Sequence, residues 1–258
     1  MYHKCHRWVS FRELADDRGW IRDTGEMRRS LAMFAAICVL VFGWTAPAHA
    51  VTYTTSRCGN TSSRILITFD DWAYDDPYRA TRTGAYLKSR DIRAAFFLEG
   101  DEAEDYPDIV ATLRQQGHWV LNHTYSHPHL TQLSDAAIRT EISKGVTSNR
   151  LRPPYGDWDD RVASIASSLG YRICWGTINT KDWQYIDGKL RSVGSIRSRV
   201  RNAPASAKYG GVIIGHLWSN YPDALPGIIS DMKAEGRLFC RINGSVGRNM
   251  GFPASCNP

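Results

Sequence analysis

The sequence has 258 residues and a formal net charge of +6. Its positive charges are scattered among acids, whereas a nucleic-acid-binding surface concentrates them, so we expect no nucleic-acid partner. A slightly basic, solvated surface suits a protein that works beside anionic cell walls. The part that follows residue 50 is long enough for one domain with a substantial core and too short for two, and we expect a monomer.

The first fifty residues are predicted to be a targeting sequence. Two arginines stand at the start of residues 27–50, the apolar run Leu31–Val41 follows, and small residues end at Ala50, which is the order of a signal peptide. We expect cleavage near Ala50 and secretion of the mature protein. The apolar run is too short for a good membrane span, so no stable span is expected in the mature form. Residues 1–26 are either an over-extended start or an unusually long region before the signal.

Four cysteines follow the predicted cleavage site, namely Cys58, Cys174, Cys240 and Cys256. An even number of cysteines in an exported chain predicts two disulfides, and three pairings are open. Because the termini of compact domains often approach each other, Cys58–Cys256 is the first expectation. None of the four has zinc-knuckle spacing.

From residue 64 onward, short β-rich runs alternate with segments of helical periodicity. Strands are expected at 64–69, 94–98, 118–121, 171–176, 211–215 and 238–242. Helices are expected at 78–90, 107–116, 134–146, 159–169, 194–203 and 224–235. This alternation predicts an α/β domain with a largely parallel sheet, either a small irregular barrel or an open doubly wound sheet. Both architectures place function at the carboxyl ends of strands.

Two adjacent carboxylates, Asp70 and Asp71, end the first predicted strand. Neighbouring carboxylates after an apolar strand are costly unless a cation, hydrogen bonds or water stabilise them. One can bind a metal while the other accepts a proton from water. A solvated loop is the plain alternative, since Asp75 and Asp76 follow closely.

Two histidines, His123 and His127, are spaced four apart, so both can meet one ion if the segment makes a single helical turn. A histidine-rich exposed loop is the alternative, because His118 and His129 flank the pair. Together with Asp71 the pair gives two histidines and a carboxylate, with open positions for water and substrate as in catalytic zinc sites. The same set also serves non-haem iron oxygenases, whose folds do not alternate strand and helix as this sequence does.

Three further segments carry candidate groups. The proline-fixed loop that starts at Arg152 offers an arginine for an aspartate and, at Tyr155, a backbone N–H for an oxyanion. Asp182 and Trp183 offer an acid that orients a histidine and an indole that walls a sugar site. His216 follows an apolar run, where a packed core histidine and a general acid are both reasonable.

In this order the segments resemble the polysaccharide deacetylase family, also called the NodB-homology family or carbohydrate esterase family four. The resemblance covers about residues 64–236. Five blocks carry it: Thr68-Phe-Asp-Asp71, His123-Thr-Tyr-Ser-His127, Arg152-Pro-Pro-Tyr-Gly156, Asp182-Trp183 and Ile214-Gly-His216. It implies a distorted (β/α) barrel of about seven strands, with residues 51–258 as a single catalytic domain.

The resemblance also implies roles for the first residues of the site. Asp70 would be the general base and Arg152 its partner. Asp71, His123 and His127 would hold one divalent ion, commonly zinc, with cobalt, manganese or nickel as other candidates.

Further roles follow from the later blocks. Tyr155 would donate its backbone N–H to the oxyanion, His216 would be the general acid and Asp182 would tune it, while Trp183 would line the groove. Trp72 stands where the family usually has glycine, and we expect it to narrow or wall the substrate groove. Asn179 replaces a frequent acid, and neither change removes a ligand.

The implied function is secreted, metal-dependent removal of N-acetyl groups from an acetylated amino-sugar polymer, either chitin, its oligosaccharides or peptidoglycan. Two alternatives stay open. One is an O-deacetylase that acts on acetylated xylan with the same site. The other is a non-catalytic sugar-binding module with Trp72, Trp158, Trp183 and Trp218 as stacking platforms.

Overall fold

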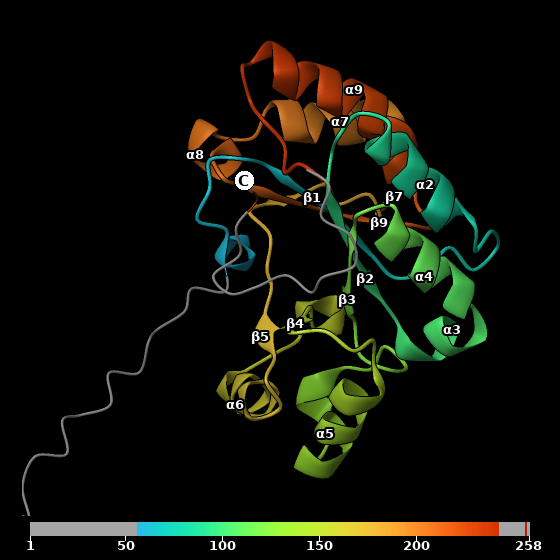
Figure 1. Ribbon diagram of the computed structural model, residues 1–258. Helices are drawn as coiled ribbons and strands as arrows, with labels where there is room; N and C mark the ends of the chain where they lie inside the picture. Colours follow the sequence, from blue (N-terminus) through green and yellow to red (C-terminus); the bar gives the residue numbers. More distant parts are fainter. Residues whose placement is uncertain (1–55, 243–255, 257–258) are drawn as a thin grey trace, which may run out of the picture. The chain divides into compact units, whose positions relative to one another are not determined.

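The computed structural model describes residues 56–242 and Cys256 (Figure 1). The expected signal peptide at 27–50, its cleavage near Ala50 and the leading residues 1–26 lie outside the described residues. Among the residues that are described, no helix is both long and apolar enough to cross a membrane.

Seven parallel strands form the central sheet, as the alternating pattern predicts (Figure 1). Their order across the sheet is β5-β4-β3-β2-β1-β9-β6. The strands are β1 (Leu66–Asp70), β2 (Ala94–Leu98), β3 (Trp119–Asn122), β4 (Arg150–Leu151), β5 (Arg172–Ile173), β6 (Ile178–Asn179) and β9 (Val212–His216).

The sheet curls because its two edge strands are joined by a very short segment. β5 and β6 lie at opposite edges, yet only residues 174–177 connect them. A fully extended chain from Ile173 to Ile178 spans at most about 18 Å. A flat sheet of this many strands would separate its edges by about 29 Å. The strands therefore bend into a half-barrel, which confirms the expected distorted (β/α) barrel over the open sheet.

The expected helices form with small shifts at their ends. Ser134 and Asp159 accept the N-terminal hydrogen bonds of α5 and α6, from the backbone N–H groups of Ala137 and Val162. The described helices are α2 (Arg79–Lys88), α3 (Gly100–Asp105), α4 (Pro107–Gln115), α5 (Asp135–Lys144), α6 (Asp160–Ser168), α7 (Val193–Arg201), α8 (Ala205–Lys208) and α9 (Tyr221–Ala234). The short α3 and α8 and a small hairpin, β7 (Tyr185–Ile186) with β8 (Lys189–Leu190), have no counterpart in the sequence prediction.

The central strands are buried on both faces, and each face has its own cluster. Alternate residues of β1 and its approach, Ile65, Ile67 and Phe69, join the main core with α2, α4, α7 and α9. Leu66 joins a second cluster with residues of β2 and β3 inside the barrel. Because side chains alternate along a strand, Thr68 and Asp70 share the inner face with Leu66. The barrel interior thus becomes polar toward the carboxyl ends of its strands.

Trp72 corrects one expectation, because its ring lies in the main core and not in a substrate groove. The side chain is fully buried, and its ring centroid lies 5.9 Å from that of Tyr106. Asp71 explains this placement, since its φ of 63° interrupts the strand alternation directly after β1. Asp70 and Asp71 can then face the same side, while the following side chain turns into the core.

The expected Cys58–Cys256 disulfide is wrong, since the structure joins Cys58 to Cys174 and Cys240 to Cys256. Cys58 lies beside the segment that closes the barrel, where its N–H donates to the Trp175 carbonyl. Proximity of the two ends of the domain therefore does not decide the pairing.

The expected last strand at 238–242 is reduced to a single bridge between Ile65 and Phe239. The Ile65 N–H donates to Leu238 and its carbonyl accepts from Cys240. The segment touches the sheet at one residue because it passes the start of β1 and continues to Arg93, whose N–H donates to the Cys240 carbonyl.

We predict that Trp72→Ala lowers the free energy of unfolding by about 3–5 kcal/mol, because it empties a large, fully buried site. Trp183→Ala is the matched control, since that ring is 45% exposed and its loss should change stability by less than about 0.5 kcal/mol. Urea unfolding followed by circular dichroism measures both. Equal effects of the two substitutions would contradict the placement of Trp72 in the core.

Candidate metal centre and catalytic groups

The candidate residues gather where neighbouring strands end. Asp70 and His216 are the last residues of β1 and β9, and they are direct cross-strand partners. His123 follows β3 by one residue. Parallel strands bring their carboxyl ends to one edge of the sheet, so residues far apart in sequence meet there.

Asp71, His123 and His127 converge on one point. Asp71 Oδ1 lies 3.1 Å from His123 Nε2 and 3.2 Å from His127 Nε2. One candidate ligand atom from each residue lies within 4.8 Å of the others. Burial raises the pKa of Asp71, but the neighbouring rings of His123 and His127 outweigh it and hold this pKa well below its usual value.

The tautomer of His123 tests whether the three residues fit a cation. His123 Nδ1 lies 2.6 Å from the Arg152 carbonyl oxygen, which can only accept, so this nitrogen carries the proton. In the neutral ring Nε2 is then a bare lone pair that faces a carboxylate oxygen. Two such acceptors repel each other unless a cation lies between them. The donor set therefore fits one divalent ion, and two histidines with one carboxylate match catalytic zinc sites.

Trp218 contributes a contact that the sequence analysis did not anticipate. Its indole Nε1–H donates to Asp71 Oδ2 at 2.8 Å, so the two oxygens of Asp71 have different partners. Trp218 was expected only as a stacking platform. The hydrogen bond leaves Oδ1 as the oxygen that faces the histidines.

Asp70 is held by a buried arginine. Arg152 is fully buried, and its Nη1 donates to Asp70 Oδ1 at 2.5 Å and to the Thr68 hydroxyl at 2.8 Å. The Asp70–Arg152 pair was predicted from the sequence, whereas the contact with Thr68 was not. The available signal was strand alternation, which puts Thr68 and Asp70 on the same face of β1.

His216 and Asp182 form a second coupled pair. His216 Nδ1 lies 2.9 Å from Asp182 Oδ1, and the His216 backbone N–H donates to Oδ2 at 2.7 Å. Burial lowers the pKa of His216, but the hydrogen bond and charge of Asp182 raise it to about 9. Thr180 and Ser219 donate their hydroxyls to Asp182, which fixes the carboxylate that orients the histidine.

Tyr155 lies in a short turn, Pro154–Gly156, with a left-handed φ of 60°. The two backbone hydrogen bonds of this turn are donated by Gly156 and Asp157, so the Tyr155 N–H takes no part in closing it. The Tyr155 ring is 65% exposed and stacks on His129 with a centroid distance of 4.0 Å.

These groups line one cavity of about 430 Å³, together with three tryptophans, Trp175, Trp183 and Trp218. The cavity is bordered by the three candidate metal ligands Asp71, His123 and His127, and by Asp70, Tyr155 and His216. Arg152 and Asp182 lie behind the wall and reach the cavity through their partners. Trp175 was missed, and Trp158 packs instead in a separate cluster beside α5 and α6.

Glu99 is a further buried carboxyl that the sequence analysis did not single out. It follows β2 directly, is 2% exposed and accepts a hydrogen bond from Tyr74. Burial and the negative charge of Asp71 raise the pKa of Glu99 to about 7. Its position after a strand was the available signal.

Comparison with known proteins supports the assignment. The family model described as polysaccharide deacetylase matches residues 59–174. The peptidoglycan-N-acetylglucosamine deacetylase of Bacillus cereus is 29% identical over 195 residues, which cover 70% of this chain and 67% of that protein. Chitin deacetylase 1 of Cryptococcus neoformans is 35% identical over 129 residues, covering 43% of this chain and only 27% of that protein.

Among solved structures, the family 4 carbohydrate esterase of Streptomyces lividans, in complex with acetate, matches with a TM-score of 0.60 and 26% identity. The match covers 72% of this chain and 97% of that one. Fold and site together define an enzyme of the deacetylase class, built on a distorted (β/α) barrel. The chain is similar to the polysaccharide deacetylase family, carbohydrate esterase family 4, and the curated relatives compared above are deacetylases.

We predict that the protein binds one Zn²⁺ per chain and that His127→Ala weakens this binding by about 100-fold or more, because loss of an outer-shell partner alone costs 10- to 100-fold. His129→Ala is the matched control, since His129 pairs with Asp157 and is not one of the three candidate metal ligands. Isothermal titration calorimetry with the metal-free protein measures both affinities. Equal affinity of the two variants would exclude His127 as a ligand.

Proposed function

We propose that this protein is an exported, metal-dependent N-deacetylase that acts on N-acetylglucosamine residues of a cell-wall polymer, either peptidoglycan or chitin. The observation that carries the proposal is one cavity that gathers Asp71, His123 and His127 between Asp70 on one side and His216 on the other. The relatives named as peptidoglycan and chitin deacetylases support the substrate class.

The ion would be held by Asp71, His123 and His127, and it would polarise the acetyl carbonyl and lower the pKa of the attacking water. Asp70 accepts the proton of that water as it attacks. Arg152 holds the Asp70 carboxylate in place through Oδ1, which leaves Oδ2 for the proton.

The backbone N–H of Tyr155 stabilises the oxyanion of the tetrahedral state, since its turn does not use this donor. His216 then donates a proton to the sugar nitrogen as the C–N bond breaks. Its raised pKa keeps it protonated at neutral pH, which suits a general acid. The products are acetate and a free amine on the sugar.

Exposed aromatic rings around the cavity support a carbohydrate polymer as substrate. Trp183 is 45% exposed and Tyr155 is 65% exposed, and both border the cavity. Flat aromatic faces pack well against the apolar faces of sugar rings, so these side chains can hold residues that flank the acetylated unit.

The alternatives predict different outcomes in the same assay. An O-deacetylase would release acetate from acetylated xylan, and the Streptomyces lividans esterase is the reason to include that polymer. A non-catalytic binding module would retain polymers without releasing acetate. An iron oxygenase would consume oxygen, and the parallel barrel argues against that class.

Export is part of the proposal because two features support it. The sequence of residues 27–50 has the order of a signal peptide, and the structure contains two buried disulfides, which persist in oxidising compartments. Cleavage after Ala50 would leave both disulfides in the mature chain.

The deciding experiment measures acetate release by the metal-loaded protein from peptidoglycan, chitin oligosaccharides and acetylated xylan side by side. We expect release from an amino-sugar polymer, loss of it after chelation and a fall in kcat of about 10²- to 10⁴-fold in Asp70→Asn with the ion still bound. Asp75→Asn, an exposed acid close by, should keep full activity. Full activity of Asp70→Asn, or activity that survives exhaustive chelation, would refute the mechanism.

The pH profile tests the role of the Asp182–His216 pair. A general acid must be protonated, so kcat should fall as pH rises through the pKa of His216, which is about 9 before any ion is bound. The charge of a bound ion lowers that pKa, so variants are compared with the same ion. Asp182→Asn removes the charge that raises the pKa and should move the alkaline limb down by about one pH unit or more. The exposed Asp187→Asn serves as control, and an unmoved limb in Asp182→Asn would contradict the pairing.

A further inference from the structure

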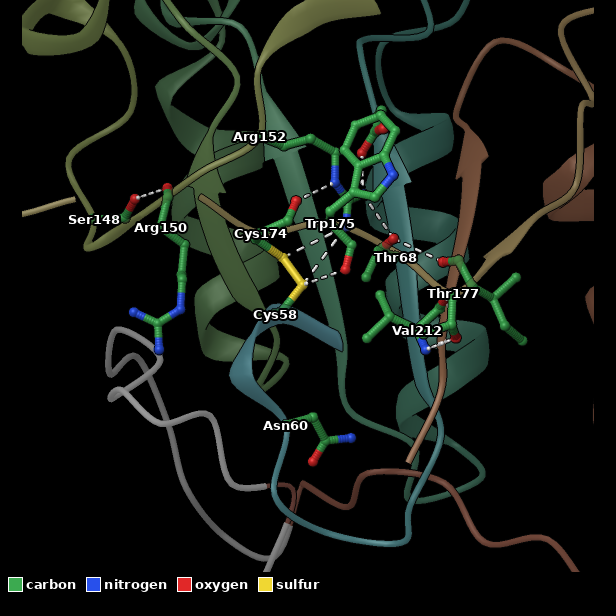
Figure 2. The surroundings of a disulfide bond; sticks show 12 residues. Cys58, Asn60, Thr68, Ser148, Arg150, Arg152, Cys174, Trp175, Thr177 and Val212 are labelled. Atoms are coloured by element: carbon green, nitrogen blue, oxygen red, sulfur yellow. Dashed lines mark hydrogen bonds and ion pairs between the residues drawn. A yellow bond between two sulfur atoms is a disulfide. The ribbon is translucent and has the colours of Figure 1, made fainter. Parts of the chain in front are cut away.

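The nitrogens of the Arg152 guanidinium all face hydrogen-bond acceptors, and Figure 2 shows this residue beside the Cys58–Cys174 disulfide and Thr68. Nε donates to the Cys174 carbonyl at 3.1 Å, and Nη1 serves Thr68 and Asp70. Nη2 faces the disulfide, 3.5 Å from Cys174 Sγ and 3.8 Å from Cys58 Sγ. The flat face of the group lies 4.0 Å from the centroid of the Phe97 ring.

The disulfide therefore packs directly against Nη2. Sulfur is a weak hydrogen-bond acceptor, so its main contribution is to occupy a defined position beside the cation. Cys58 and Cys174 are both fully buried, which means that neither the sulfurs nor the arginine can move outward into solvent. The orientation of the guanidinium toward Asp70 therefore depends on which atoms occupy the space beside Nη2.

The same disulfide fixes the backbone that carries another acceptor of Arg152. Cys174 begins the segment that joins β5 to β6, and its N–H donates to Leu151 at 2.8 Å. From the other side, the Cys58 N–H donates to the Trp175 carbonyl at 3.2 Å. The bond thus pins the closing segment, whose Cys174 carbonyl holds Arg152 Nε.

We propose that the Cys58–Cys174 disulfide is a positioning element for the reaction: it holds the Arg152 guanidinium in register with Asp70, so that activity depends on the oxidised pair. The inference rests on the proposed function, in which Asp70 is the base. Without the disulfide the closing segment is no longer tied to Cys58, and no sulfur atoms occupy the space beside Nη2. The guanidinium can then turn, and the displacement passes to Asp70 through Nη1.

The second disulfide provides a matched control within the same chain. Cys240 and Cys256 are also buried, but the Cys240 N–H donates to Ile65, at the opposite end of β1 from Asp70. Asp70 lies five positions further along the chain than Ile65, which is about 16 Å in a strand. Loss of this bond should affect stability without changing the reaction.

The experiment compares two double variants. One combines Cys58→Ala and Cys174→Ala, and the other combines Cys240→Ala and Cys256→Ala. Each double variant is made both in the parent protein and in Arg152→Lys. Lysine keeps the positive charge but lacks the Nη2 group that faces the sulfurs. kcat and KM for acetate release are measured at saturating ion and well below each melting temperature, and Zn²⁺ affinity is measured beside them. Cys58→Ser with Cys174→Ser replaces the alanine pair if the latter does not fold.

We expect loss of Cys58–Cys174 to lower kcat by about 10- to 100-fold, as small displacements of catalytic groups do, with KM within about threefold. Loss of Cys240–Cys256 should leave kcat within about twofold. In Arg152→Lys, loss of Cys58–Cys174 should add less than about twofold, because the effect passes through the missing group.

Two outcomes would overturn the proposal in a parent protein that is an active deacetylase. One is an unchanged kcat after loss of the Cys58–Cys174 disulfide. The other is an equal fall in kcat in the parent and in Arg152→Lys when this disulfide is removed. A parent protein that releases no acetate would instead refute the proposed function, and this inference with it.

Discussion

The buried Arg152–Asp70 ion pair is the interaction on which the rest of the structure depends. A charge taken out of water inside a barrel requires a partner charge and a hydrogen-bond acceptor for each edge, and breaking such a pair typically costs about 3–5 kcal/mol. Arg152 also orients one candidate metal ligand, since its backbone carbonyl fixes the proton on His123 Nδ1. One residue therefore sets both the proposed base and the tautomer of a ligand, which couples the two halves of the site.

Left-handed backbone conformations recur around the cavity. Asp71, Thr124, His127 and Tyr155 all have φ between 58° and 70°, a region that non-glycine residues seldom occupy. Such conformations cost about 1–3 kcal/mol each and persist where the surroundings enforce them. At Asp71 the consequence is clear, because two successive carboxylates can face one cavity only if the strand alternation is interrupted. The fold thus gives up some stability in order to converge its polar groups.

The fold and the convergence of most candidate site residues could be predicted from the sequence because the signals were local. The alternation of apolar runs with capped helices predicted the barrel, and the strand-end position of Asp70, His123 and His216 predicted that they meet. The two-residue strands β4 and β6 are too short for periodicity to mark them. Trp72 was misplaced because its direction depends on the backbone turn at Asp71, and the disulfide pairing depends on how the barrel closes, which no spacing of cysteines encodes.

Barrel closure and site geometry are in fact one constraint. The segment that joins the two edge strands contains Cys174, which holds Arg152, and Trp175, which walls the cavity. Gly156 packs on this segment so closely that an added Cβ would lie 2.5 Å from Trp175 Cη2, and its φ of 68° also favours glycine. The turn that carries Tyr155 is therefore seated directly on the closing segment. Any change in how far the sheet curls must move the proposed oxyanion donor and the partner of the base together, because both rest on the same four residues.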